Sequence, residues 1–340
     1  MWFTLVMSYE VTRRAALGVG AAAAATFAFG SPAGATETDK NPVNHIRKKY
    51  SKLTAEAGGR WHSHIAMVNG EGALETVLED DADFVTNGYS VQKLFVAMTV
   101  LDKVDRGLLT MGQRLDLQAS IILGGSGIYH LHGVWGDDIT IANFLTAMLL
   151  VSDNTSVRMC GRVVPALEIN EILAAKGFVK TRVEPVANPN RFFLGVTTPR
   201  ETHDFLWRLA NGTLLSPAST DFLLRVTRWV NGYHDGIRRS MSSNERSRVA
   251  TKYGADFNTL GAARNEAGIM FNTDGSPALT YAMFADSLGD LDNYGSTHPA
   301  VEVHAKLGRV MFDSLPAPVA GLAARSFRHT VPQFVPVNGG

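Results

Sequence analysis

Ser90 and Lys93 are the residues whose types and spacing most directly suggest catalysis. Gly88 and other turn-forming residues precede them, and an almost unbroken apolar run follows over residues 94–101. Such a run predicts a helix buried on most sides, with Ser90 near its N-terminus. Residues three apart share a helix face, so the hydroxyl and the amine can meet. A buried lysine near other cations can lose its proton near neutral pH and then take the proton of the serine.

The same pair also has a purely structural interpretation. Serine is a common helix N-cap, and a lysine in the first turn can extend its charged end to solvent. A serine three residues before a lysine also occurs often by chance. The pair alone leaves both interpretations open.

The elements around this pair predict one sheet interrupted by a block of helices. The expected strands lie at residues 64–68, 73–77, 249–254, 265–271 and 279–284. The expected helices lie at residues 43–57, from 90 to the glycine at 107, and at 139–150, 156–164, 167–177, 219–229 and 300–315. A further helix is expected to begin at residues 197–199, with threonine as the cap and proline in the first turn. Residues 181–196 are expected to be irregular. The predicted fold is α+β, an antiparallel sheet flanked by helices with an all-helical insertion, over residues 36–315.

Composition and charge describe a globular protein without a preference for nucleic acid. Of the 340 residues, 45% are hydrophobic, and 32 basic residues balance 32 acidic ones. The sequence contains no basic block and no nucleic-acid-binding motif, so we expect no nucleic-acid partner. Cys160 is the single cysteine, which excludes an internal disulfide; its apolar helical context favours a buried thiol.

Residues 1–35 have the composition of an export signal. Arg13 and Arg14 precede an Ala/Gly-rich stretch of moderate hydrophobicity, and small residues up to Ala35 suit a cleavage site. Paired arginines before a weakly apolar core resemble the twin-arginine signal, and an ordinary secretory signal is the alternative. The stretch is too short and too rich in alanine and glycine for a membrane anchor. We expect an exported protein with a proline-rich C-terminal tail at residues 316–340.

The segment from residue 124 to residue 132 combines glycines with two histidines. The glycine run lacks the spacing of a phosphate-binding loop and follows no strand, so it does not predict a nucleotide site. His130 and His132 have no third placed ligand, and we expect a loop rather than a metal site. Tyr129, between the glycines and the histidines, is a candidate substrate-binding residue.

Two further motifs follow the Ser90 motif in a fixed order. Ser152-Asp153-Asn154 comes directly after an apolar helical segment, and Lys252-Tyr253-Gly254 lies on a predicted strand. With Ser90-x-x-Lys93, they resemble the S-x-x-K, S-D-N and K-T-G set of class A β-lactamases and penicillin-binding proteins. The resemblance covers about residues 40–315 and identifies the chain as a β-lactamase-like serine hydrolase.

The resemblance implies how bonds would break at this site. Ser90 would attack an acyl carbon and form a covalent acyl-enzyme, with Lys93 as the base, although the family's base is disputed. Ser152 would relay a proton to the leaving nitrogen or oxygen. No cofactor or metal is implied, and the expected partner is a small-molecule or peptidoglycan-like substrate bound by a monomer.

The resemblance also implies how a substrate would be held. Asn154 would bind an amide of the acyl group, and Lys252 would face the anionic group of the substrate. The N–H groups of Ser90 and of Ala255, which follows Gly254, would form the oxyanion hole.

Two departures from the family concern the substrate and turnover. Tyr253 replaces a threonine or serine whose hydroxyl holds the β-lactam carboxylate, and Arg264 on the next predicted strand could partly replace that contact. Glu184 opens a segment, residues 184–188, that resembles the E-x-x-L-N segment whose glutamate activates the deacylating water. The loop around Glu184 is shorter than in typical β-lactamases, so a solvated loop carboxylate is the alternative.

The expected function is therefore exported hydrolysis of β-lactam or related amide and ester bonds. Two alternatives stay open. One is a D-Ala-D-Ala carboxypeptidase or an esterase acting on a secreted metabolite. The other is a β-lactam-binding or sensor-like domain that is acylated without turnover.

Overall fold

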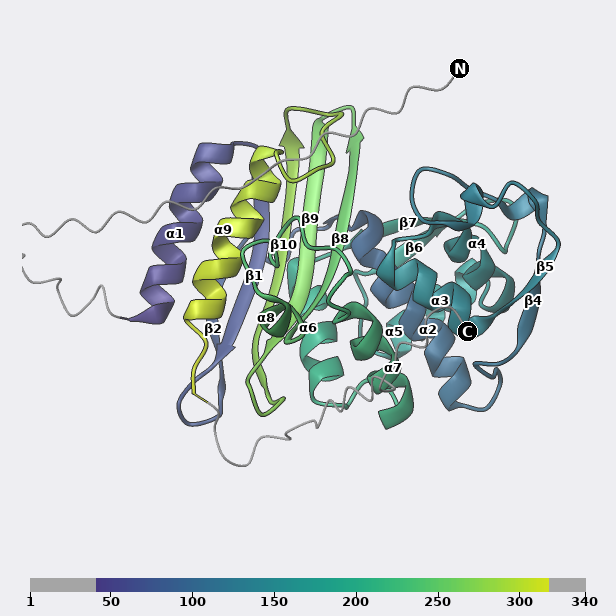
Figure 1. The fold of residues 1–340 in the computed structure, drawn as a ribbon, viewed down its shortest axis with the longest axis horizontal. Coiled ribbons are helices and arrows are strands. Elements are labelled where there is room, and N and C mark those ends of the chain that lie inside the picture. Colours follow the sequence, from purple (N-terminus) through teal and green to yellow (C-terminus); the bar gives the residue numbers. More distant parts are fainter. Residues whose placement is uncertain (1–40, 318–340) are drawn as a thin grey trace, which may run out of the picture. The chain divides into compact units, whose positions relative to one another are not determined.

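A five-stranded antiparallel sheet, ordered β2-β1-β10-β9-β8, forms the centre of the structure (Figure 1). Its strands are β1 (Arg60–Val68), β2 (Leu74–Asp80), β8 (Val249–Asn258), β9 (Gly261–Phe271) and β10 (Pro277–Leu288). The computed structural model describes residues 41–317, so the predicted export signal and nearly all of the predicted tail lie outside the described residues. The prediction that two early and three late strands share one sheet is confirmed.

Helices α1 (Pro42–Ala57) and α9 (Pro299–Asp313) lie side by side over one face of this sheet (Figure 1). Their apolar side chains share a core with sheet residues such as Met67 and Tyr281. Each helix has proline in its first turn and a capping side chain: Asn41 accepts from the N–H of Val43 in α1. Such caps satisfy N–H groups that a helix cannot bond internally.

The other face of the sheet meets the helical part of the chain, where α6 packs against β1, β9 and β10. The α-helices of this part are α2 (Lys93–Asp105), α3 (Ile141–Leu150), α4 (Asn154–Val163), α5 (Ala166–Ala175), α6 (Pro199–Ala210) and α7 (Pro217–Thr227). The first nine residues of α2 are all buried, which confirms the prediction from the apolar run. Because helices cover both faces of the sheet, β9 and β10 are almost continuously buried.

Short strands and turns were the elements that sequence patterns did not predict. They are β3 (Thr86–Asn87), β4 (Arg114–Leu117), β5 (Asp137–Thr140), β6 (Arg182–Pro185), β7 (Phe192–Thr197), the short helix α8 (Ser243–Arg246) and the 3-10 helices η2 (Tyr89–Gln92), η3 (Ala119–Ile121) and η4 (Tyr129–Leu131). The prediction that residues 181–196 are irregular is wrong, because β6 and β7 form a sheet with β3 there. The strands β3, β4, β5 and β6 have four residues or fewer, which is too few for a clear alternating pattern, and Gly195 interrupts the pattern in β7.

None of the helices within residues 41–317 has the length and apolar character needed to cross a membrane.

Candidate active site

Ser90 lies in η2, immediately before α2, on the wall of a cavity of about 1280 Å³. The preceding residue, Tyr89, has a φ of 45°, in the left-handed region that non-glycine residues seldom adopt. Such strain persists only where the surroundings impose it, and it is common at functional sites. The chain therefore bends sharply just where the predicted nucleophile enters the cavity.

Lys93, the first residue of α2, has a completely buried side chain. Its Nζ donates to the carbonyl oxygen of Ser152 at 2.5 Å, to the Oγ of Ser152 at 3.0 Å and to the Oδ1 of Asn154 at 2.7 Å. Burial lowers the pKa of Lys93 to about 7. Near neutral pH the amine can therefore both hold and release a proton.

Ser152 connects two lysines. Its Oγ lies 3.0 Å from the Nζ of Lys93 and 3.0 Å from the Nζ of Lys252, which comes from β8. Lys252 is also buried and donates to the carbonyl oxygen of Tyr253 at 2.8 Å. Burial, and secondly the charge of Lys93, lowers the pKa of Lys252. The structure thus brings three of the predicted catalytic residues into one hydrogen-bonded line.

Asp153 explains why the second motif occupies this position. Its Oδ1 caps α4 by accepting from the N–H of Ser156 at 2.7 Å, while its Oδ2 accepts from the N–H groups of Ile128 and Tyr129 at 2.7 and 2.9 Å. A Cβ on Gly127 would lie 2.2 Å from the Cα of Asp153, so this close approach requires glycine. The carboxylate therefore ties α4 to the glycine-containing segment at the edge of the cavity.

Tyr129 does not lie on the cavity wall. Its side chain is 6% exposed and belongs to the core of the helical part. Leu123, Gly125 and Ser126, a few residues earlier, line the cavity instead.

Gly254 allows β8 to approach Ser90. A Cβ at this position would lie 2.9 Å from the backbone nitrogen of Ser90 and 2.8 Å from that of Val91. Only glycine fits there without displacing the backbone of η2. The next residue, Ala255, lines the same cavity as Ser90, an arrangement that suits the predicted oxyanion hole.

Tyr253 stacks on Tyr233, with ring centroids 4.3 Å apart and an angle of 9° between the ring planes. Both rings line the cavity, and both hydroxyl groups are buried without a hydrogen-bond partner in the described part of the chain. Burial raises the pKa of Tyr253 well above its ordinary value. The ring therefore contributes an apolar wall at the position where the family carries a small hydroxyl.

Arg264, on β9, is fully buried and does not line the cavity. Its guanidinium donates to the carbonyl oxygens of Asp256, Ala263, Leu291 and Asn293, at distances from 2.7 to 3.1 Å. The ring of Tyr294 covers it at 4.6 Å. Its donors are thus used in holding the chain, and the structure does not bring it to the predicted carboxylate contact.

Glu184, on β6, has an exposed side chain that lines the cavity. None of the hydrogen bonds that Lys93 makes within residues 41–317 goes to Glu184. The structure therefore brings Glu184 to the same cavity as Ser90, without joining it to the two lysines.

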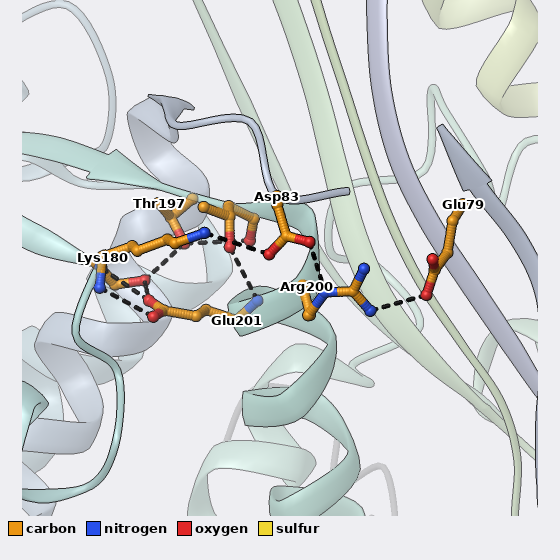
Figure 2. A network of polar contacts seen from close by, with 8 residues as sticks. Glu79, Asp83, Lys180, Thr197, Arg200 and Glu201 are labelled. Carbon is orange, nitrogen blue, oxygen red and sulfur yellow. Dashed lines mark hydrogen bonds and ion pairs between the residues drawn. The ribbon is translucent and has the colours of Figure 1, made fainter. Parts of the chain in front are cut away.

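The chain leading into β6 is held by the carboxylate of Glu201 (Figure 2). Glu201 accepts from the N–H of Lys180 at 2.8 Å and from the N–H of Thr181 at 2.7 Å. Beside it, Arg200 bonds to Asp83 at 3.0 Å and to Glu79 at 2.7 Å, as Figure 2 shows. This network fixes the start of the strand that carries Glu184.

Sequence reasoning missed Tyr233 and Glu201, and it gave Asn265, within a segment that fits the family, no role in the site. Asn265 donates through Nδ2 to the carbonyl oxygen of Asn87 at 3.0 Å and so holds the turn before Ser90. A buried polar residue inside an apolar strand was the available signal, because such groups need partners. Tyr233 lies in a segment whose sequence gives no comparable signal. Glu201 stands three residues after Thr198, the spacing of a capping box, but its carboxylate bonds to Lys180 and Thr181 instead. Over residues 41–317 no group of three metal-binding side chains is placed to hold an ion.

Comparisons with known proteins agree with this geometry. The model of the Beta-lactamase enzyme family matches residues 46–315. A β-lactamase from Xanthomonas campestris has 20% identity and a TM-score of 0.66, over 80% of this chain and 98% of its own. A β-lactamase from Chitinophaga pinensis has 22% identity and a TM-score of 0.65, over 79% of this chain and 99% of its own. A variant of PBP-A was solved as an acyl-enzyme complex with penicillin G. It has 19% identity and a TM-score of 0.62, over 79% of this chain and 96% of its own.

No curated protein matches the chain. The solved structures share its fold, and the family model covers most of its length. The chain belongs to the β-lactamase enzyme family and is a β-lactamase-like serine hydrolase.

Proposed function

We propose that the protein hydrolyses β-lactam or related amide and ester bonds through a covalent acyl-enzyme on Ser90, after export from the cell. The observation that supports this most strongly is the buried line of Lys93, Ser152 and Lys252, of which Ser152 and Lys252 line the same cavity as Ser90. A serine hydroxyl is a weak nucleophile until an adjacent base takes its proton. Two lysines of lowered pKa around one relay hydroxyl provide such a base and a route for the proton.

Acylation proceeds by attack of Ser90 and departure of the leaving group. The Oγ of Ser90 attacks the carbonyl carbon, and its proton passes to the neutral amine of Lys93. Negative charge develops on the carbonyl oxygen, which the N–H groups of Ser90 and Ala255 stabilise. The bond to the leaving nitrogen or oxygen then breaks. The hydroxyl of Ser152 protonates the leaving atom and recovers a proton from the ammonium of Lys93.

Deacylation requires a base that activates water for attack on the ester of Ser90. Glu184 is a carboxylate on the wall of the same cavity, and we assign it this role. Because Glu184 makes no hydrogen bond to Lys93 within residues 41–317, slow turnover of a long-lived acyl-enzyme is the second candidate.

The aromatic pair of Tyr233 and Tyr253 favours a substrate without a carboxylate at that wall. Arg264, which could have faced such a carboxylate, has its guanidinium bonded to backbone carbonyls. Esters and amides that place no carboxylate at that wall are therefore the substrates we expect to react faster than penicillins.

Intact-mass spectrometry tests the proposal. The mature protein is incubated separately with penicillins, cephalosporins, an acyl-D-Ala-D-Ala peptide and simple esters. We expect a mass increase equal to the acyl group, absent from Ser90→Ala. An adduct that persists in Ser90→Ala would show that another residue is acylated. The absence of both an adduct and a hydrolysis product with every compound would contradict acyl transfer.

A further inference from the structure

Two arginines, Arg158 and Arg191, line the same cavity as Ser90, and neither belongs to the motifs of the family. Arg158 lies on α4, four residues after Asn154. Residues at this spacing share a helix face and lie about 6 Å apart along the helix axis. Arg158 is thus the next side chain along the face on which Asn154 meets Lys93.

The two guanidinium groups lie against one short segment of backbone. Arg158 donates through Nη1 to the carbonyl oxygen of Ile122 at 2.8 Å and of Ile121 at 3.4 Å. Arg191 donates through Nη2 to the carbonyl oxygen of Ser120 at 3.2 Å. Bonding to consecutive carbonyls keeps the two cations close together. Burial, and secondly the charge of Arg191, lowers the pKa of Arg158.

Within residues 41–317, no acidic partner balances the positive charge of the two arginines. Among residues 41–317, no carboxylate forms an ion pair with either arginine. The exposed carboxylate of Glu184 lines the same cavity without pairing with them. In addition, the Nη1 of Arg191 is buried and has no hydrogen-bond partner in the described part of the chain. An unused buried donor beside a second cation is energetically costly.

We propose that Arg158 and Arg191 bind a carboxylate carried by the acyl part of the substrate. Arginine suits this role because its fork of donors matches the two oxygens of a carboxylate. The resemblance assigns Asn154 to the amide of the acyl group, and Asn154 precedes Arg158 by one helical turn. The acyl part of the substrate is therefore the part that would extend to the two arginines. The inference rests on the proposed function, because it names the substrate class of the same site.

Matched esters test the assignment. The mono-4-nitrophenyl esters of straight dicarboxylic acids with six to eight carbons carry a carboxylate at the end of the acyl chain. The matched neutral esters end in a primary amide, which is uncharged and similar in size to the carboxylate. We expect wild type to prefer the carboxylate ester in kcat/KM at one chain length. Arg158→Gln and Arg191→Gln should each reduce that preference by about tenfold.

Arg162→Gln is the matched control. Arg162 lies on the same helix and donates to the carbonyl oxygen of Asp116 at 2.6 Å, but does not line the cavity. This variant should keep the preference of wild type. If Arg158→Gln slows both esters equally, the two arginines only hold residues 120–122, and the proposal is overturned. Equal rates for carboxylate and amide esters in wild type, at every length, overturn it as well.

A binding measurement separates this inference from the proposed reaction. Calorimetric titration of Ser90→Ala with the corresponding 4-nitroanilides requires no bond to break. The anion site is supported, even if no ester is hydrolysed, when the carboxylate compound binds Ser90→Ala more tightly than the amide compound does. This difference in affinity should be lost in Ser90→Ala/Arg158→Gln. Equal binding of the two compounds contradicts the anion site even if Ser90 is acylated.

Discussion

The hydroxyl of Ser152 lies between two lysines, 3.0 Å from each, and this placement governs how the site responds to pH. Lys93 acts as a base only when it is neutral, and burial lowers its pKa to about 7. An unfolded lysine titrates near 10.4, so the unfolded chain binds the additional proton between these values. Burial of Lys93 therefore destabilises the folded protein less and less as pH rises from about 7 to about 10.4.

The rate of acylation should follow the neutral fraction of Lys93. Below pH 7 the second-order rate constant for acylation of Ser90 should fall about tenfold per pH unit, and above it the rate should level off. Stopped-flow measurement with a chromogenic ester between pH 5 and 9 gives this profile. A rate that is constant across the range would remove Lys93 from the role of base.

Tyr253 determines which anionic substrates fit beside β8. Tyr253→Thr restores a small hydroxyl and removes a ring, so we expect penicillin acylation to rise by about fivefold, the value of roughly one hydrogen bond. Ester hydrolysis should change less. Tyr253→Phe is the control: it keeps the stacking on Tyr233 and removes a hydroxyl that has no partner among the described residues. If Tyr253→Thr lowers both activities equally, the tyrosine is structural.

At the scale of the elements, β6 and β7 were unpredictable for a physical reason. Arg182–Pro185 is four residues long, and its pairing with β7 is fixed by contacts from elsewhere. Asn170 bonds to both backbone groups of Val183, at 2.8 and 3.0 Å, and Glu201 holds the preceding turn. These partners are distant in sequence, so no local pattern reports them. By contrast, α2 and the strands of the main sheet follow from long apolar runs.

The same contrast applies to the site. The motif residues and their order could be read from the sequence, whereas the orientation of Arg264 could not. Its position on β9 suggested a cation near Tyr253, but carbonyl groups of residues 256, 291 and 293 take up its donors. The sequence of a strand does not indicate which loop will fold over it or which carbonyl groups that loop will bring.

Because β6 is anchored at both sides, Glu184 should act from a fixed position. Glu184→Gln keeps size and hydrogen bonding but cannot accept a proton. We expect acylation to remain close to wild type and deacylation to fall by roughly 10²–10⁴. The acyl-enzyme should then persist for minutes in intact-mass spectra. Turnover like that of wild type would mean that Glu184 is a solvated carboxylate and that another group activates water.

At the scale of the molecule, the site is complete only when distant parts of the chain have met. Ser90 and Lys93 come from the helical part, while Lys252 and Gly254 come from β8. In addition, β1 pairs with β10, so the main sheet joins early and late segments. We therefore expect the site to form only after contacts between distant residues have closed.

We propose that residues 1–35 direct the protein to a route that exports folded proteins, because Arg13 and Arg14 precede a weakly apolar stretch. If Arg13 and Arg14 are read by the twin-arginine receptor, replacing both by lysine preserves charge but should block export. Precursor should then accumulate in the cytoplasm, which fractionation and immunoblotting of a bacterial host can measure. Ser90→Ala, with an intact signal, serves as the control and should be exported normally. Normal export of the double lysine variant would instead assign the protein to the general secretory route.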